Sequence, residues 1–197
     1  MNLAAVILAA GASRRMGRIK ALLPFRGETV LDRLIGLYGR FAAPVIVVLG
    51  HHEAEIRRGM VRGSEAVIAV NPEPERGQLS SLQCGLRLAP EDVLFSPVDF
   101  PAVEQATVAA LLREFPARPA ATLVAPSFAG KHGHPVLIRA ALKDELLALA
   151  PEDTARTALH RHGQTAFYLD VEDAGVTADI DSPEEYEQLL AREGARG

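Results

Sequence analysis

The chain is poor in the residues that build disulfides, thiolate metal sites and membrane spans. Its 197 residues contain one cysteine, Cys84, and no tryptophan, and only 5% of them are aromatic. A lone cysteine excludes an intramolecular disulfide and a cysteine-based zinc site, which fits a reducing cytoplasmic setting. No apolar run approaches the roughly 20 residues that a membrane-spanning helix needs. The first apolar run is followed rather than preceded by arginines, which is the wrong order for a signal peptide. We therefore expect a soluble, cytoplasmic protein with no membrane partner.

A strong excess of one charge is also missing. Lysine and arginine total 21 against 25 aspartates and glutamates, which gives a formal net charge of −4. Without a basic stripe to offset that balance, nucleic acid is not an expected partner. Hydrophobic residues make up 48% of the chain and charged residues 23%, as in ordinary globular proteins. At this length we expect a single domain over residues 1–197.

Short apolar runs alternate with amphipathic segments along the whole chain. Runs such as Leu3–Leu8 and Val45–Leu49 are typical of strands buried on both faces of a parallel sheet. Strands are expected at Leu3–Leu8, Val45–Leu49, Ala66–Val70, Val93–Val98, Thr122–Pro126, Pro135–Ile138 and Ala166–Val171. Helices are expected after Thr29, at His52–Arg62, from Ser80 or Ser81 through Leu88, at Glu104–Phe115, Ala140–Leu149 and Thr154–His162, and after Ser182. The alternation predicts an α/β fold, a three-layer α/β/α arrangement around a Rossmann-like, mostly parallel sheet with an antiparallel strand.

The loop after the first strand is small, flexible and cationic. Residues 8–20 read Leu-Ala-Ala-Gly-Ala-Ser-Arg-Arg-Met-Gly-Arg-Ile-Lys, and residues 10–20 are called the cationic loop below. Small residues let backbone N–H groups approach a polyphosphate, and the cations neutralise its charge. A dinucleotide fingerprint needs a glycine where Ser13 stands, and a P-loop needs Lys directly after Gly17, so neither known loop fits. The plainer alternative is a turn whose arginines face water, but its position after a buried strand favours phosphate binding.

Carboxylates at two places are candidates for a metal site. Asp99 follows the expected strand 93–98. In parallel sheets ligands bind beyond the carboxyl ends of strands, where Gly11 and Asn71 also fall. Mg²⁺ takes one or two carboxylates together with phosphate oxygens, although an Asp in such a turn is often only a cap. Asp179 and Asp181 would lie on the same side of the chain if the segment is extended, and one of them could then be a second metal ligand. The alternative is that their negative charges stabilise the N-terminus of the helix that follows.

Two further groups of polar residues have both a binding and a structural interpretation. Gln78-Leu79-Ser80-Ser81 could read a nucleobase edge by hydrogen bonds, or the serines could cap a helix. Asn71 fits a strand-end turn equally well. Histidines occur in two pairs, His132 with His134 and His160 with His162. Their spacing resembles that of metal ligands, but no known zinc motif surrounds them.

Taken together, five ordered blocks resemble the MobA-like nucleotidyltransferases. Besides the cationic loop they are Asn71-Pro72 with Arg76-Gly77-Gln78-Leu79-Ser80-Ser81-Leu82, Pro97-Val98-Asp99-Phe100-Pro101, Gly133-His134-Pro135-Val136-Leu137, and Asp179-Ile180-Asp181-Ser182-Pro183-Glu184-Glu185. They stand in the family's order and cover nearly the whole chain. The Ala9-Ala10-Gly11 version of the loop looks most like the molybdenum-cofactor cytidylyltransferase branch, because guanylyl-transferring relatives commonly have Gly-Gly there.

The resemblance implies a nucleotide-diphospho-sugar transferase type of fold and a set of site residues. The implied catalytic residues are Lys20, Arg15 and Asp99. Nucleotide binding is implied for Ala9, Ala10, Gly11, Ser13, Arg14, Lys20, Asn71, Gln78, Ser80 and Ser81. Asp99 would hold Mg²⁺ together with Asp179 or Asp181, and His134 would lie near the acceptor.

The expected activity is Mg²⁺-dependent transfer of a nucleoside monophosphate to a phosphorylated acceptor, with release of pyrophosphate. The resemblance suggests CTP as the donor, a molybdopterin-type acceptor, and a molybdenum hydroxylase as a downstream partner. Two alternatives stay open at this point. One is a sugar- or polyol-phosphate nucleotidyltransferase on the same scaffold. The other is a non-catalytic protein that carries or inserts the cofactor for such a hydroxylase.

Overall fold

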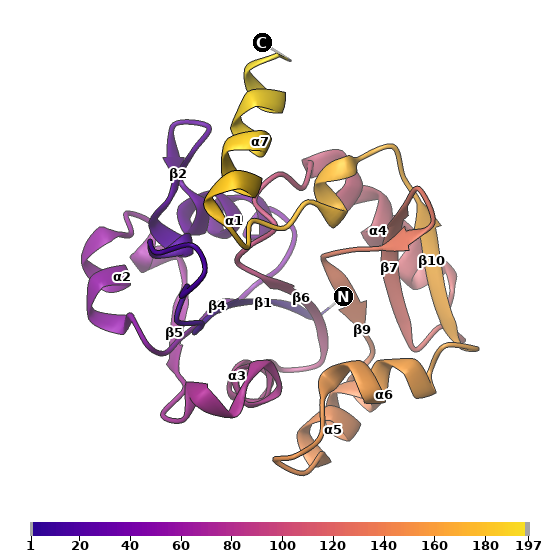
Figure 1. Cartoon of the computed structure of the whole chain (residues 1–197). Helices are drawn as coiled ribbons and strands as arrows, with labels where there is room; N and C mark the ends of the chain where they lie inside the picture. The colour runs from indigo at the N-terminus through magenta and orange to yellow at the C-terminus, as the bar shows by residue number, and fades with distance from the viewer. Residues whose placement is uncertain (1, 196–197) are drawn as a thin grey trace.

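The computed structural model describes residues 2–195 (Figure 1). Its strands are β1 (Leu3–Ala9), β2 (Pro24–Phe25), β3 (Glu28–Thr29), β4 (Val45–Leu49), β5 (Val67–Val70), β6 (Asp92–Pro97), β7 (Leu123–Phe128), β8 (Lys131–His132), β9 (Val136–Ile138) and β10 (Ala166–Asp170). Its α-helices are α1 (Val30–Tyr38), α2 (Glu53–Gly59), α3 (Gln78–Leu86), α4 (Gln105–Ala117), α5 (Ala140–Ala148), α6 (Ala155–Arg161) and α7 (Pro183–Gly194).

One mixed sheet forms the centre of the molecule. Its strand order is β10-β7-β9-β6-β1-β4-β5, with β8 added to β7. β9 runs antiparallel to both neighbours and β8 is antiparallel to β7, while the other pairings in this sheet are parallel. The short strands β2 and β3 form a separate hairpin. The predicted mostly parallel sheet with an antiparallel strand is therefore confirmed.

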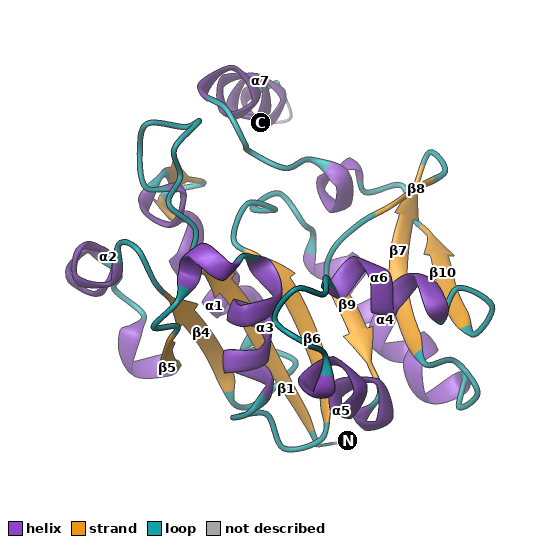
Figure 2. Ribbon diagram, turned by 60° about the horizontal axis from the view of Figure 1, so that its bottom comes forward, coloured by secondary structure: helices purple, strands orange, loops and turns teal. Residues whose placement is uncertain are grey.

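Helices cover both faces of the sheet, as Figure 2 shows. α3, α5 and α6 lie on one face, and α1 and α4 lie on the other. Because strand side chains alternate between faces, β1 serves both cores: Ala5 and Ile7 join the α1 side, whereas Val6 and Leu8 join the α3 side. The predicted three-layer arrangement is confirmed, and the parallel strands all point their carboxyl ends toward one rim.

The start of α3 differs from the sequence prediction. The helix begins at Gln78 with Gly77 as its N-cap, two or three residues before the predicted start, so neither Ser80 nor Ser81 caps it. Gly77 has φ +93°, a conformation that glycine adopts without strain. Farther along the helix, a Cβ at Gly85 would lie 2.4 Å from a Val6 methyl group, so glycine is what lets α3 pack closely against β1.

Side-chain caps begin two other helices as the sequence predicts. Thr29 accepts a hydrogen bond from Asp32 N at the start of α1. The Asp32 carboxylate does not complete a capping box, however, because it accepts from the backbone N–H groups of Val61 and Arg62 instead. Ser182 begins α7 with a complete capping box.

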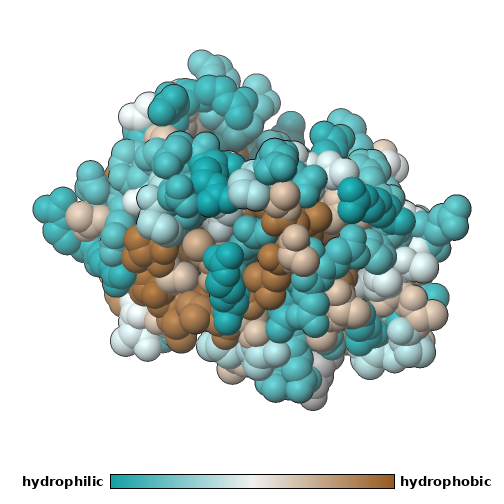
Figure 3. Space-filling view, turned by 90° about the horizontal axis from the view of Figure 1, so that it is seen from below, coloured by the Kyte–Doolittle hydropathy of each residue, from teal (hydrophilic) through white to brown (hydrophobic). Residues whose placement is uncertain are grey.

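The molecular surface agrees with the ordinary composition of the chain. Over residues 2–195, no helix is both long enough and apolar enough to span a bilayer. Seen from the side that carries α3, α5 and α6, the surface is mostly hydrophilic with separate apolar patches (Figure 3). Cys84, the lone cysteine, lies on α3 and is half-buried against the core on this side.

Candidate active site

A cavity of about 310 Å³ opens at the carboxyl ends of β1 and β6, beside the N-terminus of α3. The residues that line it come from five separate stretches of the chain. They are Leu8, Ala9, Ala10, Gly11, Ser13, Arg14, Arg15, Ile19, Lys20, Ala21, Ile56, Pro74, Gly77, Gln78, Ser81, Pro97, Val98, Asp99 and Asp181. The structure thus gathers most of the predicted site residues in one pocket. Asn71, Ser80, His134 and Asp179 do not line it.

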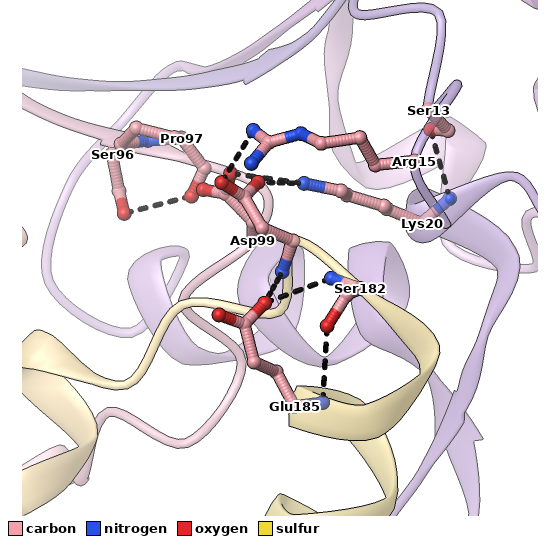
Figure 4. A network of polar contacts seen from close by, with 9 residues as sticks. Ser13, Arg15, Lys20, Ser96, Pro97, Asp99, Ser182 and Glu185 are labelled. Atoms are coloured by element: carbon pink, nitrogen blue, oxygen red, sulfur yellow. Dashed lines mark hydrogen bonds and ion pairs between the residues drawn. The ribbon is translucent and has the colours of Figure 1, made fainter.

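Charged side chains gather at what we call the charged end of the pocket: Arg15, Lys20, Asp99 and Asp181. The Lys20 ammonium group lies 2.5 Å from Asp181 Oδ1 and 3.4 Å from Asp99 Oδ2. Arg15 donates to the other oxygen of Asp181 at 2.6 Å. Figure 4 shows the Arg15 and Lys20 side chains both extending toward Asp99. The Lys20 side chain is only 13% exposed, so its pairing with the two carboxylates is sheltered from solvent, whereas Arg15 is mostly exposed.

Backbone contacts explain why Asp181 is at the charged end and Asp179 is not. Ile180 is fully buried, and its N–H donates to the carbonyl of Asp99 at 3.0 Å. Glu185 then accepts from the backbone N–H groups of both Asp181 and Ser182, each at 2.8 Å. The segment forms no strand with another part of the described chain, and only one of the two aspartates lines the pocket. Asp179 is exposed, and Asp181 lies in the pocket.

The two carboxylates respond differently to this environment. Burial raises the pKa of Asp99 above its ordinary value, and this outweighs the attraction of Lys20. The hydrogen bond from Lys20 holds the pKa of Asp181 below its ordinary value. One oxygen of Asp99, Oδ1, is buried and has no hydrogen-bond partner among residues 2–195, whereas Oδ2 faces Lys20. The charged end therefore contains one carboxylate that cations stabilise at both oxygens and one that they contact at a single oxygen.

The charged end fits a divalent cation by its donor set. Mg²⁺ is held by one or two carboxylates with phosphate oxygens and water completing its octahedral shell, rather than by a full protein cage. Across residues 2–195, no cluster of three or more acidic, histidine or cysteine side chains could hold a metal alone. Asp99 and Asp181 are the two carboxylates that such a cation would find at the charged end.

One buried side chain and two hydrogen bonds hold the cationic loop in place. Met16 is buried in the α1-side core and anchors the loop at its centre. Ser13 Oγ accepts from the backbone N–H of Lys20 at 3.2 Å, so this serine shapes the loop. His52 Nε2 donates to the Ala12 carbonyl at 3.2 Å. Gly11 is exposed and lines the pocket, with no protein atom within 4 Å of the position that a Cβ would take.

The part of the lining that comes from the start of α3 and the segment before it is uncharged, and we call it the uncharged end: Pro74, Gly77, Gln78 and Ser81. Within residues 2–195 no side chain caps α3, which leaves N–H groups of its first turn without a side-chain acceptor, and Gly77 and Gln78 at this helix start line the pocket. Asn71 lies behind the pocket wall and donates to the hydroxyl groups of Ser80 and Ser81. Of the two serines, only Ser81 lines the cavity.

His134 lies near the pocket but does not line it. Its ring lies 4.7 Å from that of Phe100 and 6.0 Å from that of Phe95, centre to centre. Burial lowers the pKa of His134 to about 4, so the imidazole is neutral at pH 7. Its Nδ1 atom is buried and has no hydrogen-bond partner in the part of the chain that the structure describes. The predicted contact with an acceptor stays a prediction, and it would use a neutral ring.

Sequence reasoning missed two residues that hold the site together. The Glu185 carboxylate accepts hydrogen bonds from the Asp181 backbone as well as from the helix N-cap, and the sequence analysis assigns it neither contact. His52 gave no signal in the sequence, because its partner is a carbonyl group 40 positions away. The capping-box pattern directly after Asp181 is the one signal that could have revealed the first of these contacts.

Comparison with known proteins agrees with this geometry. A model of the MobA-like NTP transferase domain matches residues 5–166. The molybdenum cofactor cytidylyltransferase of Escherichia coli (strain K12) is 26% identical over 182 residues, which cover 92% of each chain. The nicotine blue oxidoreductase of Paenarthrobacter nicotinovorans is 32% identical over 204 residues, covering 94% of this chain and 95% of that protein.

Solved structures share the fold over almost the whole chain. The crystal structure of Rv0371c from Mycobacterium tuberculosis H37Rv has a TM-score of 0.82 at 28% identity and covers 96% of this chain and 97% of its own. A complex of Rv0371c with manganese has a TM-score of 0.79 at 26% identity, with coverage of 97% and 99%. The family match spans far more than half of the residues, and it includes the cationic loop and Asp99. The chain therefore belongs to the MobA-like NTP transferase family and is a nucleotidyltransferase.

Proposed function

We propose that the protein transfers CMP from CTP to a phosphorylated acceptor of the molybdopterin type, with Mg²⁺ bound at the charged end. The observation that carries this proposal is the placement of Lys20 between Asp99 and Asp181 at the carboxyl ends of β1 and β6. A triphosphate needs cations, and a metal bridging to it needs carboxylates; both are present within one pocket.

The chain's own residues would act by positioning and by neutralising charge. An acceptor phosphate is already an anion, so it can attack the α-phosphorus without a general base, and the α–β bond breaks as pyrophosphate leaves. Lys20 and Arg15 would neutralise the leaving pyrophosphate, and the backbone of the cationic loop at Gly11 would approach its oxygens closely. Asp99 and Asp181 would hold Mg²⁺, which supplies Lewis-acid stabilisation of phosphate charge when bound.

Relatives support the choice of donor and acceptor. The E. coli relative is named a molybdenum cofactor cytidylyltransferase, and the Ala9-Ala10-Gly11 version of the loop agrees with that branch. The manganese complex of Rv0371c supports a divalent cation. In this proposal the product passes to a molybdenum hydroxylase in the cytoplasm.

The test is pyrophosphate release from each of the four nucleoside triphosphates with a molybdopterin acceptor, with and without Mg²⁺. We expect release to require both metal and acceptor and to be fastest with CTP. Asp99→Asn should abolish release, while exposed Asp179→Asn should retain it. Tight nucleotide binding without release would identify a carrier, and release with sugar phosphates instead of molybdopterin would identify a different acceptor. Electron transfer without pyrophosphate release would instead place the chain with the oxidoreductase relative.

A further inference from the structure

Two carbonyl groups of the cationic loop face the turn that follows β4. The backbone N–H of His51 donates to the carbonyl of Ala10 at 3.3 Å, and Nε2 of the His52 ring lies 3.2 Å from the carbonyl oxygen of Ala12. A carbonyl oxygen can only accept, so Nε2 is a protonated nitrogen of this ring. A Cβ at Gly50 would lie 2.8 Å from the Ala10 carbonyl oxygen, so glycine lets the two segments approach this closely. Both carbonyl groups are thus held on the β4 side of the loop.

Fixing these carbonyl groups also fixes the direction of the N–H groups that follow them. In a planar trans peptide the C=O and the next N–H point in opposite directions, so the N–H groups of Gly11 and Ser13 point away from the turn after β4. Gly11 and Ser13 line the pocket, whereas Ala12 and His52 do not. Within residues 2–195, neither of these N–H groups donates to a protein acceptor. The turn after β4 therefore leaves two backbone donors at the pocket wall.

Ser13 holds its N–H in this direction at a conformational cost. Its φ is +50°, in the left-handed region that a residue with a Cβ adopts only where neighbouring contacts impose it. Turning over the peptide between Ala12 and Ser13 would bring the φ of Ser13 back to negative values and would point the Ala12 carbonyl toward the pocket. His52 opposes this rotation, because the turned peptide loses its hydrogen bond. The other contacts of Ser13, from the N–H groups of Gly17 and Lys20, use its carbonyl and hydroxyl oxygens and do not fix the preceding peptide.

We propose that His52 is a positioning residue, which keeps the peptide between Ala12 and Ser13 turned so that its N–H group faces the bound polyphosphate. This inference rests on the proposed function, in which the cationic loop surrounds the phosphates. A turned peptide would replace a hydrogen-bond donor by a carbonyl oxygen, and that oxygen would repel the phosphate charge. Because His52 does not line the pocket, it acts on the ligand only through this peptide.

Inorganic tripolyphosphate with Mg²⁺ tests the inference without a nucleobase or an acceptor. His52→Leu removes the ring donor, and we expect Kd for tripolyphosphate to rise roughly ten- to hundredfold. Kd for each of the four nucleoside triphosphates should rise by the same factor, because they share the phosphate chain. His52→Gln keeps an N–H donor on a side chain of similar reach and should restore most of the affinity. Exposed His160→Leu on α6 is the matched control and should bind as the wild type does.

Replacing the strained residue separates positioning from a structural role. Glycine adopts a φ of +50° without strain, so in a Ser13→Gly background the peptide has less tendency to turn over. His52→Leu should therefore raise Kd by a smaller factor in that background than in the wild-type background. A merely structural role predicts the same factor in both backgrounds, with a lower thermal unfolding temperature. Should His52→Leu fail to fold, His52→Asn carries the test, because its amide is too short to reach the Ala12 carbonyl, and the same rise in Kd is expected.

The outcomes separate this inference from the function on which it rests. Folded His52→Leu with a wild-type Kd for tripolyphosphate overturns the inference, as do equal losses in the Leu and Gln variants or equal factors in the two backgrounds. Absence of pyrophosphate release by the wild-type protein with every triphosphate overturns the proposed function, and the tripolyphosphate series still tests the role of His52. A wild-type protein that binds neither tripolyphosphate nor any nucleoside triphosphate overturns both.

Discussion

The two ends of the pocket hold their polar groups in different ways. At the charged end, Lys20 balances two carboxylates, so the side chains are matched by charge and one oxygen of Asp99 stays without a partner. At the uncharged end, Asn71 donates to both serine hydroxyl groups, so neutral side chains are held in place by hydrogen bonds from one buried amide. The charged end thus depends on the balance between cations and carboxylates, whereas the uncharged end depends on hydrogen bonds between neutral groups.

The largest expected effect comes from removing the balancing cation. Lys20→Met should reduce pyrophosphate release by about a thousandfold or more, because the phosphate charge loses its buried partner. It should also lower the free energy of unfolding in metal-free buffer by about 1–2 kcal/mol, because Asp99 and Asp181 then repel each other. The effect is no larger because both side chains are partly exposed to solvent, which screens the repulsion. Added Mg²⁺ should restore that stability. Denaturant unfolding with and without Mg²⁺ measures this, with exposed Lys131→Met as the control.

A matched pair of aspartates tests whether position rather than charge matters at this end. Asp181→Asn should lower metal-dependent release by roughly a hundredfold and raise the Mg²⁺ concentration needed for half-maximal rate. Asp179→Asn removes the same charge two residues earlier on an exposed side chain and should leave both quantities near wild type. Equal losses in the two variants would mean that net charge, not a ligand at the charged end, explains the effect.

A pH titration extends the comparison to a group that belongs to neither end. The pKa of buried His134 is lowered to about 4, so between pH 6.5 and 4 the unfolded chain binds a proton that the folded chain does not. The free energy of unfolding should therefore fall as the pH drops through that window, by up to about 3 kcal/mol from this group. The contribution is present above pH 6.5 and is lost toward pH 4. His134→Gln should flatten this part of the profile, measured by denaturant unfolding at each pH.

The smallest expected effect separates the local stability of a helix from the placement of Asp181. Ser182→Ala should cost about 1 kcal/mol through loss of the α7 cap, and it should also raise the Mg²⁺ requirement. Thr154→Ala removes a comparable cap, at α6, and should cost a similar amount without changing the Mg²⁺ requirement. A shift of the metal requirement in both variants would contradict a role for the α7 cap in holding Asp181.

Much of the charged end could be predicted because it depends on strand ends. Apolar runs placed β1 and β6 to within one residue at each end, and in a parallel sheet their carboxyl ends had to meet at one rim. Lys20 and Asp99 follow from that placement. Which of Asp179 and Asp181 lines the pocket could not be predicted in this way, because it depends on the buried Ile180 and the hydrogen bond from its N–H to the Asp99 carbonyl. A long-range backbone contact of that kind has no sequence pattern.

The uncharged end was harder to predict because its residues are compatible with several local structures. A double serine after a glycine is an ordinary helix start, and only the positive φ of Gly77 moves the N-cap back to that residue. The short hairpin of β2 and β3 and the two-residue strand β8 were also missed, since runs of two residues show no periodicity.

The order of the site along the chain has a consequence for biosynthesis. The cationic loop and Asp99 are translated early, whereas Asp181 and the capping box that holds it come 82 or more positions after Asp99, past the last residue of the family match. The second carboxylate of the proposed metal site is therefore the last part of the site to be synthesised. Under the proposed function, the site is complete only after α7 has docked.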